Sequence, residues 1–282
     1  MTVYQLNNNI IAQLQKVTDA DEARAMARVI FEDVLGMPPV KVVLNRDVVL
    51  EPETVERVNG IVERVVAGEP LQYVLGSARF MGMTFKVTPA TLIPRPETAE
   101  LVDMIVKDCG RRDNLRVLDV GTGSGCIAIS LARALSYPEV KAIDISDEAL
   151  AVARENAQSL KVGIDFRHAD ALTLSTDEKG IFDIIVSNPP YVADSEAAHM
   201  LPRVLDYEPH SALFVPDSDP LRFYRAISEF AVKSLTDDGA LYFEINPLFA
   251  NDMRSMLSAQ GWREIDIIRD FRGKERFAVC RK

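Results

Sequence analysis

The sequence predicts an α/β protein in which a mostly parallel sheet follows a small helical region. From residue 115 onward, apolar runs of strand length alternate with amphipathic runs of helix length. Such alternation is typical of a parallel sheet with helices on both faces. A glycine-rich turn after the first of these strands, and an Asn-Pro-Pro-Tyr stretch after a later one, both fall at strand ends. Open α/β sheets bind their ligands at such ends.

The N-terminal region has the periodicity of helices. Apolar residues recur at helical spacing over 4–14 and again over 21–35, and Gly36 follows where a C-cap belongs. A third helix is expected over 51–66, since the proline near its start is tolerated in a first turn. No cluster of an acid, a base and a nucleophile is visible here. We therefore expect residues 1–78 to form a helical domain that docks a substrate or partner.

A hairpin and a stiff linker are expected next. Residues 79–87 alternate as two short strands with a turn near Gly82. Residues 92–98 contain two prolines, which favour an extended segment leading into a helix that begins near Glu97. We place the hairpin and linker at 79–96 and the large domain at 97–282.

The large domain supplies the alternating elements in order. Strands are expected at 115–120, 140–145, 164–168, 181–187 and 240–245, and helices at 126–135, 148–160, 221–235 and 248–260. Two late apolar runs, 264–269 and 276–281, predict an antiparallel pair, so the last strand of the sheet would run opposite to the others.

Composition narrows the class of protein. The chain has 282 residues, enough for one large and one small domain, and a net charge of -10 from 32 basic and 42 acidic residues. This charge weakens the case for tight, sequence-independent DNA binding, which needs many phosphate contacts. No apolar run approaches the roughly 20 residues of a membrane span, and the N-terminus has no signal-peptide pattern. The three cysteines lack metal-ligand spacing, so we expect a reduced, cytoplasmic protein with no metal and no membrane partner.

The glycine-rich turn, Asp-Val-Gly-Thr-Gly-Ser-Gly over 119–125, predicts a cofactor site. Glycines permit a tight turn and let a ligand approach the backbone. Asp144 ends the following strand about 20 positions later, where a carboxylate that binds a ribose belongs. Both NAD and S-adenosylmethionine (AdoMet) carry ribose hydroxyls, but the turn departs from the Gly-x-Gly-x-x-Gly of dinucleotide enzymes. The predicted cofactor-binding residues are Asp119, Gly121, Thr122, Gly123, Ser124, Gly125, Asp144, Asp170 and Asn188.

Several of these acids have more than one possible role. Asp119 could orient the turn, or it could meet the positively charged methionine end of AdoMet. Asp170, after the third strand, could accept a hydrogen bond from an adenine amino group. Asp144 and Asp170 could also be ordinary turn or cap residues, which is a common use of aspartate.

The stretch Asn188-Pro189-Pro190-Tyr191 follows the apolar strand 182–187 directly. Two prolines cannot continue a strand, so the chain must leave the sheet in a stiff loop at the strand's carboxyl end. An asparagine and a tyrosine held there can act on a flat, polar substrate that contains nitrogen. The alternative is an Asn-Pro turn with a tyrosine in the core.

Together these motifs resemble the class I AdoMet-dependent N-methyltransferases. The segments at 69–76, 92–98, 207–209 and 270–277 narrow the resemblance to the protein-(glutamine-N5) methyltransferase family (PrmC/HemK), over nearly the whole chain. The resemblance implies a Rossmann-like, mostly parallel sheet with an antiparallel last strand, preceded by a helical domain. It also implies AdoMet as the methyl donor and S-adenosylhomocysteine as product. The implied partner is a peptide chain release factor, methylated on the glutamine of its Gly-Gly-Gln motif.

The resemblance also assigns roles within the Asn-Pro-Pro-Tyr stretch. A carboxamide nitrogen is a poor nucleophile because its lone pair is delocalised into the carbonyl. The Asn188 side-chain oxygen and the Pro189 backbone carbonyl would accept its two N–H groups, and Tyr191 would pack against the planar amide. Asn188, Pro189 and Tyr191 are thus the expected catalytic residues, and Pro190 joins them in binding the substrate. We expect no catalytic histidine or glutamate, since the methylated amide can lose its proton to water.

Some positions depart from the family or stay open. Ala99 stands where an acid is expected, residues 244–247 lack an expected glycine, and 215–220 replace a glycine-rich turn. Arg95 could line the site, meet the backbone of the partner, or be a solvated linker charge. Glu97 could be only a first-turn acid stabilised by the helix dipole.

Two other functions compete with this interpretation. An N6-adenine methyltransferase acting on DNA or RNA would use the same Asn-Pro-Pro-Tyr device, but it would need a basic groove that the net charge does not favour. A non-catalytic AdoMet-binding module would have no use for the tetrapeptide, and neither would a dehydrogenase. We therefore expect no nucleic-acid substrate. The sequence does not set the oligomeric state, and a monomer is expected.

Overall fold

The computed structural model describes residues 1–110, 112–175 and 179–282, and it divides into two compact units. The helical unit comprises residues 1–76 together with 202–207. The sheet unit comprises residues 77–201 and 208–282. A short piece of the chain beyond the Asn-Pro-Pro-Tyr stretch thus belongs to the helical unit, although its flanks belong to the sheet unit.

The helical unit packs the apolar faces of its helices into one core. Its helices are α1 (Val3–Leu14), α2 (Ala20–Leu35), α3 (Pro39–Leu44), α4 (Pro52–Val66), α5 (Leu71–Leu75) and α9 (Pro202–Leu205). The three long helices are those that the periodicity predicts, and Gly36 ends α2 in the left-handed conformation. Helices α3, α5 and α9 were not predicted, because runs of four to six residues show no clear helical period. Arg203 of α9 donates to Glu22 of α2 at 2.7 Å.

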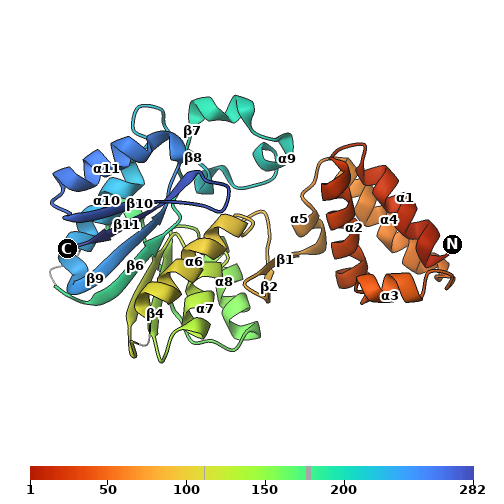
Figure 1. The fold of residues 1–282 in the computed structure, drawn as a ribbon, viewed down its shortest axis with the longest axis horizontal. Coiled ribbons are helices and arrows are strands. Elements are labelled where there is room, and N and C mark those ends of the chain that lie inside the picture. Colours follow the sequence, from red (N-terminus) through yellow and green to blue (C-terminus); the bar gives the residue numbers. More distant parts are fainter. Residues whose placement is uncertain (111, 176–178) are drawn as a thin grey trace. The chain divides into compact units, whose positions relative to one another are not determined.

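The sheet unit is built on a seven-stranded sheet (Figure 1). Its strands are β3 (Arg116–Val120), β4 (Glu139–Asp144), β5 (Asp165–His168), β6 (Phe182–Ser187), β9 (Leu235–Glu244), β10 (Glu264–Arg269) and β11 (Glu275–Arg281). They lie in the order β10-β11-β9-β6-β3-β4-β5. Strands β9, β6, β3, β4 and β5 are parallel, and the last strand, β11, is antiparallel to both of its neighbours. The predicted fold class is therefore confirmed.

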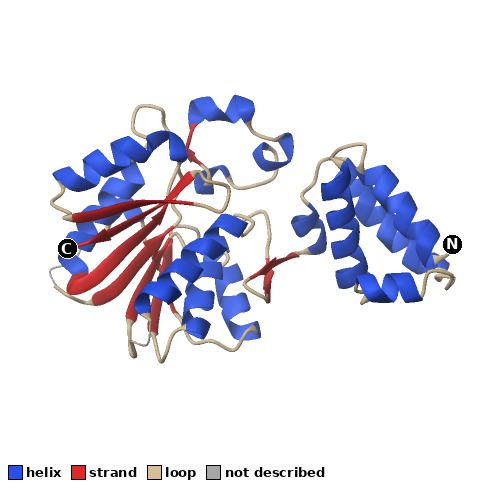
Figure 2. Cartoon of the chain, viewed as in Figure 1, coloured by secondary structure: helices blue, strands red, loops and turns tan. Residues whose placement is uncertain are grey.

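Helices cover both faces of this sheet. Helices α6 (Pro96–Cys109), α7 (Cys126–Ala134) and α8 (Asp147–Ser159) lie on one face, and α10 (Arg222–Ser234) and α11 (Ala250–Ala259) on the other (Figures 1 and 2). Side chains along the strands alternate between the two faces. Val117 and Ile184 belong to the apolar core under α6 and α7, whereas Leu118 and Ile185 belong to the core under α10 and α11. Burial on both faces explains why the strands read as continuous apolar runs. No helix of the described residues is long and apolar enough to cross a membrane.

Two small pairs of strands flank the sheet. The predicted hairpin is β1 (Ser77–Phe80) and β2 (Met83–Lys86). Asn156 of α8 holds β2 like a neighbouring strand, because its amide accepts from the Lys86 N–H at 2.7 Å and donates to the Lys86 carbonyl at 3.0 Å. The pair β7 (Val192–Ala193) and β8 (Phe214–Val215) was not predicted, and it closes the loop that follows the two prolines. That loop also contains 3-10 turns at Asp194–His199 and His210–Ala212.

Candidate active site

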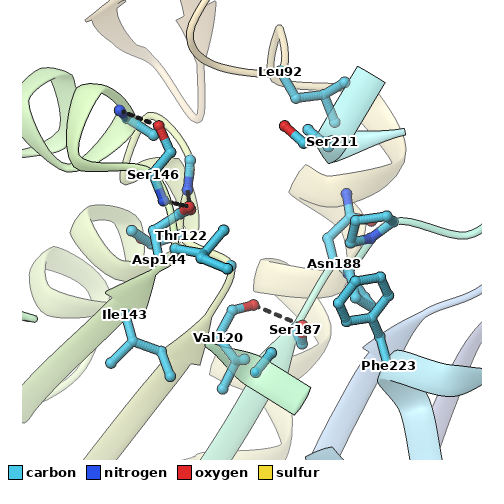
Figure 3. A pocket seen from close by; sticks show the side chains of 18 of the residues that line it. Leu92, Val120, Thr122, Ile143, Asp144, Ser146, Ser187, Asn188, Ser211 and Phe223 are labelled. Atoms are coloured by element: carbon cyan, nitrogen blue, oxygen red, sulfur yellow. Dashed lines mark hydrogen bonds between the residues drawn. The ribbon is translucent and has the colours of Figure 1, made fainter. Parts of the chain in front are cut away.

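A cavity of about 350 Å³ opens at the carboxyl edge of the sheet, where β3, β4, β5 and β6 end. Because β6 and β4 lie on opposite sides of β3, the strand order changes direction here, which is where open α/β sheets form their ligand crevices. Figure 3 shows Asp144 and Thr122 on one side of the cavity, and Asn188 and Phe223 on the other. Among the predicted site residues, those that line it are Gly121, Thr122, Gly123, Ser124, Asp144, Asp170, Asn188, Pro189 and Pro190.

The glycine-rich turn is held against the neighbouring strand by its own backbone. The N–H groups of Gly121 and Thr122 both donate to the Ile143 carbonyl, at 2.9 and 3.0 Å. Gly125 does not line the cavity. It has φ +80°, and a Cβ there would lie 3.1 Å from Ile129 and 3.2 Å from Ala153. Gly125 thus lets α7 and α8 pack closely behind the turn.

Asp119 lies beneath this turn rather than in the cavity. It is fully buried, and its Oδ2 accepts from the Thr122 hydroxyl at 2.7 Å and from the Ala128 N–H at 3.2 Å. Of the two roles considered for Asp119, these contacts favour orienting the turn. Burial raises the pKa of Asp119 from 3.8 to about 7, although both hydrogen bonds act in the opposite direction.

This raised pKa predicts a pH-dependent stability of the sheet unit. A carboxyl whose folded pKa exceeds its unfolded value stabilises the fold below the unfolded pKa, and this stabilisation is lost as pH rises through the folded pKa. Between pH 4 and 8, ionisation of Asp119 should therefore lower the free energy of unfolding by about 4 kcal/mol, since each tenfold change in proton affinity is worth about 1.4 kcal/mol. The Asp119→Asn variant should lose less stability than the wild type over this range. Urea unfolding followed by Trp262, the single and buried tryptophan, measures the difference. Equal slopes in the two proteins would contradict the prediction.

The two acids at the ends of β4 and β5 both line the cavity. Asp144 accepts from the Gly123 N–H at 2.8 Å through Oδ2 and from the Ser146 N–H at 3.0 Å through Oδ1. Asp144 therefore joins the glycine-rich turn to the start of α8. Asp170 accepts from the Leu172 N–H at 2.8 Å, so it is a cap residue as well as a lining residue.

The Asn-Pro-Pro-Tyr loop is fixed from both ends. The Ser187 hydroxyl donates to the Val120 carbonyl at 2.6 Å, and the Tyr191 N–H donates to the Leu213 carbonyl at 3.1 Å. Asn188, Pro189 and Pro190 face the cavity, whereas Tyr191 is not among its lining residues. The Tyr191 hydroxyl instead donates to Glu244 at 3.0 Å. Packing of Tyr191 against a substrate amide stays a prediction.

Arg95 and Glu208 form a pair beside the cavity that the sequence did not predict, since the role of Arg95 was open and Glu208 was not among the predicted site residues. Arg95 lines the cavity, and its Nη2 donates to Glu208 Oε1 at 2.5 Å. Glu208 is almost fully buried, and its Oε2 also accepts from the Ile93 N–H at 3.2 Å. Arg95 is therefore a lining residue rather than a free linker charge. The two segments that contain Arg95 and Glu208 carried the family resemblance, which was the one available signal of their pairing.

Thr98 and Glu244 were not among the predicted site residues either. Thr98 lines the cavity at the start of α6, and Glu244 is buried at the end of β9. Glu97, beside Thr98, lies in the first turn of α6, as expected for an acid near a helix N-terminus.

The donor and acceptor groups of this cavity fit AdoMet. The ribose hydroxyls and the adenine amino group of its nucleoside can donate hydrogen bonds to Asp144 and Asp170. Its flat adenine ring can pack against apolar walls. Ile143, Ile145 and Leu172 supply such walls beside the two acids. Gly121 and Gly123 both have positive φ, and a Cβ added at either residue would meet no atom within 4 Å. The backbone of the turn is therefore accessible to a ligand.

Comparison with known proteins gives matches along most of the chain. The PrmC N-terminal domain matches residues 5–76, and the Methyltransferase small domain matches residues 98–206. The release factor glutamine methyltransferase of Bacteroides thetaiotaomicron is 44% identical over 269 residues, covering 95% of this chain and 96% of the relative. The protein of the same name from Flavobacterium psychrophilum is 39% identical over 279 residues, covering 98% of each.

Among solved structures, the chain is similar in fold to the Thermus thermophilus 16S rRNA N2 G1207 methyltransferase in complex with AdoMet and guanosine. The TM-score is 0.54 at 20% identity, over 73% of this chain and 49% of that one. This likeness concerns the fold and agrees with the sheet topology described above.

Proposed function

The chain belongs to the release factor glutamine methyltransferase family, and we propose that it methylates the side-chain amide nitrogen of a release factor glutamine, with AdoMet as donor. The glutamine is that of the Gly-Gly-Gln motif. One observation carries the proposal. A single cavity is lined both by the acids suited to a nucleoside, Asp144 and Asp170, and by the carbonyl-bearing pair Asn188 and Pro189.

The residues of this cavity address the weakness of an amide nucleophile. AdoMet, when bound, supplies an electrophilic methyl group on a sulfonium. The amide nitrogen becomes positive as it forms its new bond, so acceptors aimed at its two N–H groups stabilise the transition state. The Asn188 Oδ1 and the Pro189 carbonyl are the two proposed acceptors. The ring of Pro189 restricts its backbone, so its carbonyl needs little reorganisation.

No residue of the chain is required as a strong base in this scheme. The amide nitrogen attacks while it still holds both protons, and the methylated cation is acidic enough to release one to water. Positioning and charge stabilisation are thus the contributions asked of the protein.

The remaining assignments are proposals that rest on this function. We propose a helical domain over 1–78 that docks the release factor, a linker over 79–96, and a transfer domain over 97–282. Because a release factor acts where translation occurs, the enzyme would work in the cytoplasm. We propose that it does so as a monomer.

The first test is to incubate the full-length protein with methyl-labelled AdoMet and a recombinant release factor, and to locate the label by peptide mass. One methyl group on the Gly-Gly-Gln glutamine is expected, and replacing that glutamine should abolish it. A release factor that stays unlabelled while DNA or RNA becomes labelled would refute the proposal and favour the N6-adenine alternative. The net charge of -10 favours the protein substrate.

A further inference from the structure

A buried carboxylate lies behind the Asn-Pro-Pro-Tyr loop and contacts it by two routes. Glu244 ends β9 and is 1% exposed. Its Oε2 accepts from the Thr98 hydroxyl at 2.7 Å, and its Oε1 accepts from the Tyr191 hydroxyl at 3.0 Å. The Tyr224 hydroxyl donates to the Glu244 backbone carbonyl at 3.0 Å and so holds the main chain from which the carboxylate extends.

The first route continues from Thr98 to Asn188. The Asn188 Nδ2 donates to Thr98 Oγ1 at 3.3 Å. Burial raises the pKa of Glu244, whereas the hydrogen bonds from Thr98 and Tyr191 lower it and favour the ionised form. An ionised carboxylate can only accept hydrogen bonds, whereas a hydroxyl has one proton to donate and lone pairs to accept. Because Thr98 gives its proton to Glu244, its oxygen is left as an acceptor toward Asn188. The hydroxyl can therefore pair with the NH₂ of that carboxamide and not with its oxygen.

This direction decides which atom of Asn188 meets a ligand. With Nδ2 bound to Thr98, the carboxamide oxygen is the atom left for the cavity that Asn188 lines. A carboxamide turned by half a circle would present an NH₂ group to the N–H groups of a substrate amide. Two donors cannot form a hydrogen bond, so that orientation would not stabilise the charge that develops on the nitrogen.

We propose that Thr98 and Glu244 are positioning residues for methyl transfer, which hold the Asn188 carboxamide with its oxygen toward the substrate. The inference rests on the proposed function, because it requires Asn188 Oδ1 to accept a hydrogen bond from a substrate N–H. Tyr191 is the second residue held by the same carboxylate. Glu244 thus orients the residues at the two ends of the tetrapeptide, one through Thr98 and one directly.

Thr98→Val in the full-length protein tests the proposal, because it keeps the side-chain shape and removes the hydroxyl. We expect kcat with a release factor to fall about 10- to 100-fold, as orientation is lost. The release factor KM, and the AdoMet Kd measured by calorimetry, should each change less than about threefold, since Thr98 acts on Asn188 rather than on binding. Thr98→Ser, which restores the hydroxyl, should keep kcat within about threefold of wild type.

Ser234→Ala is the matched control, since Ser234 is fully buried in the same unit and donates to the Phe230 carbonyl at 2.9 Å. It lies where β9 begins, whereas Glu244 lies where β9 ends. This variant should keep the wild-type kcat. Trp262 fluorescence confirms that each variant is folded at the assay temperature. If Thr98→Val unfolds below the assay temperature, Thr98→Ala replaces it, because alanine has no γ-methyl group to place beside the carboxylate.

Three outcomes with an active wild type would overturn the inference and leave the proposed function standing. They are an unchanged kcat in Thr98→Val, a kcat in Thr98→Ser as low as in Thr98→Val, and a loss of AdoMet affinity as large as the loss of kcat. A wild-type protein without activity on any release factor would refute the proposed function itself, and the inference would fall with it.

Discussion

Replacing Asn188 by alanine is expected to lower kcat about 10²- to 10³-fold, the usual effect of removing one preorganised group that stabilises transition-state charge. The Asn188 oxygen is the proposed acceptor for one N–H of the substrate amide, and alanine leaves that N–H without a partner. The backbone carbonyl of Pro189 remains, so a residual rate should be measurable. Single-turnover transfer from labelled AdoMet to a release factor separates this step from product release.

The cofactor affinity of Asn188→Ala should change little. Although Asn188 is also a predicted cofactor-binding residue, it lies across the cavity from Asp144 and Ser146 (Figure 3). We expect the AdoMet Kd to stay within about threefold of wild type, because no charged hydrogen bond is removed. Asn251→Ala is the control, since Asn251 is an exposed asparagine in α11. A kcat within tenfold of wild type, or a proportionate loss of AdoMet binding, would rule out the role given to Asn188.

The parts of the fold that could be predicted are those whose signal is local. Strands β3 and β6 are buried on both faces, so each reads as an apolar run, and each is followed at once by its glycine or proline motif. Asp144 could be predicted for the same reason, because its position is set by the strand that it ends. The glycine-rich turn can be recognised from its own residues, without any distant part of the sequence.

The parts that could not be predicted depend on residues far apart in the chain. Thr98 and Glu244 are 146 positions apart, and no periodicity connects them. Helix α9 is four residues long and belongs to the helical unit as part of residues 202–207, whereas residues 77–201 and 208–282 lie in the sheet unit. The contact of the Tyr191 hydroxyl could not be predicted for a related reason, because its acceptor, Glu244, lies 53 positions further along the chain.

The second large effect is expected for Asp144→Ala, which should raise the AdoMet Kd about 100-fold, or about 2.7 kcal/mol. Two backbone N–H groups, those of Gly123 and Ser146, lose a charged acceptor, and each such hydrogen bond is typically worth about 1.5–3 kcal/mol. The glycine-rich turn would then lose its direct tie to the end of β4. Any hydrogen bond from Asp144 to a ribose hydroxyl would be lost as well. Calorimetric titration of the full-length variant with AdoMet measures the change.

Asp147→Ala provides the comparison that isolates this effect. Asp147 is only three positions away, in the first turn of α8, but its side chain is 77% exposed and pairs with His168. Its removal should leave the AdoMet Kd within about twofold, because exposed ion pairs contribute little. If Asp144→Ala bound AdoMet as well as Asp147→Ala does, the contacts of Asp144 would be those of an ordinary turn residue. A selective loss in Asp144→Ala would instead mean that this carboxylate shapes the turn for its ligand, since both variants remove one negative charge near the N-terminus of α8.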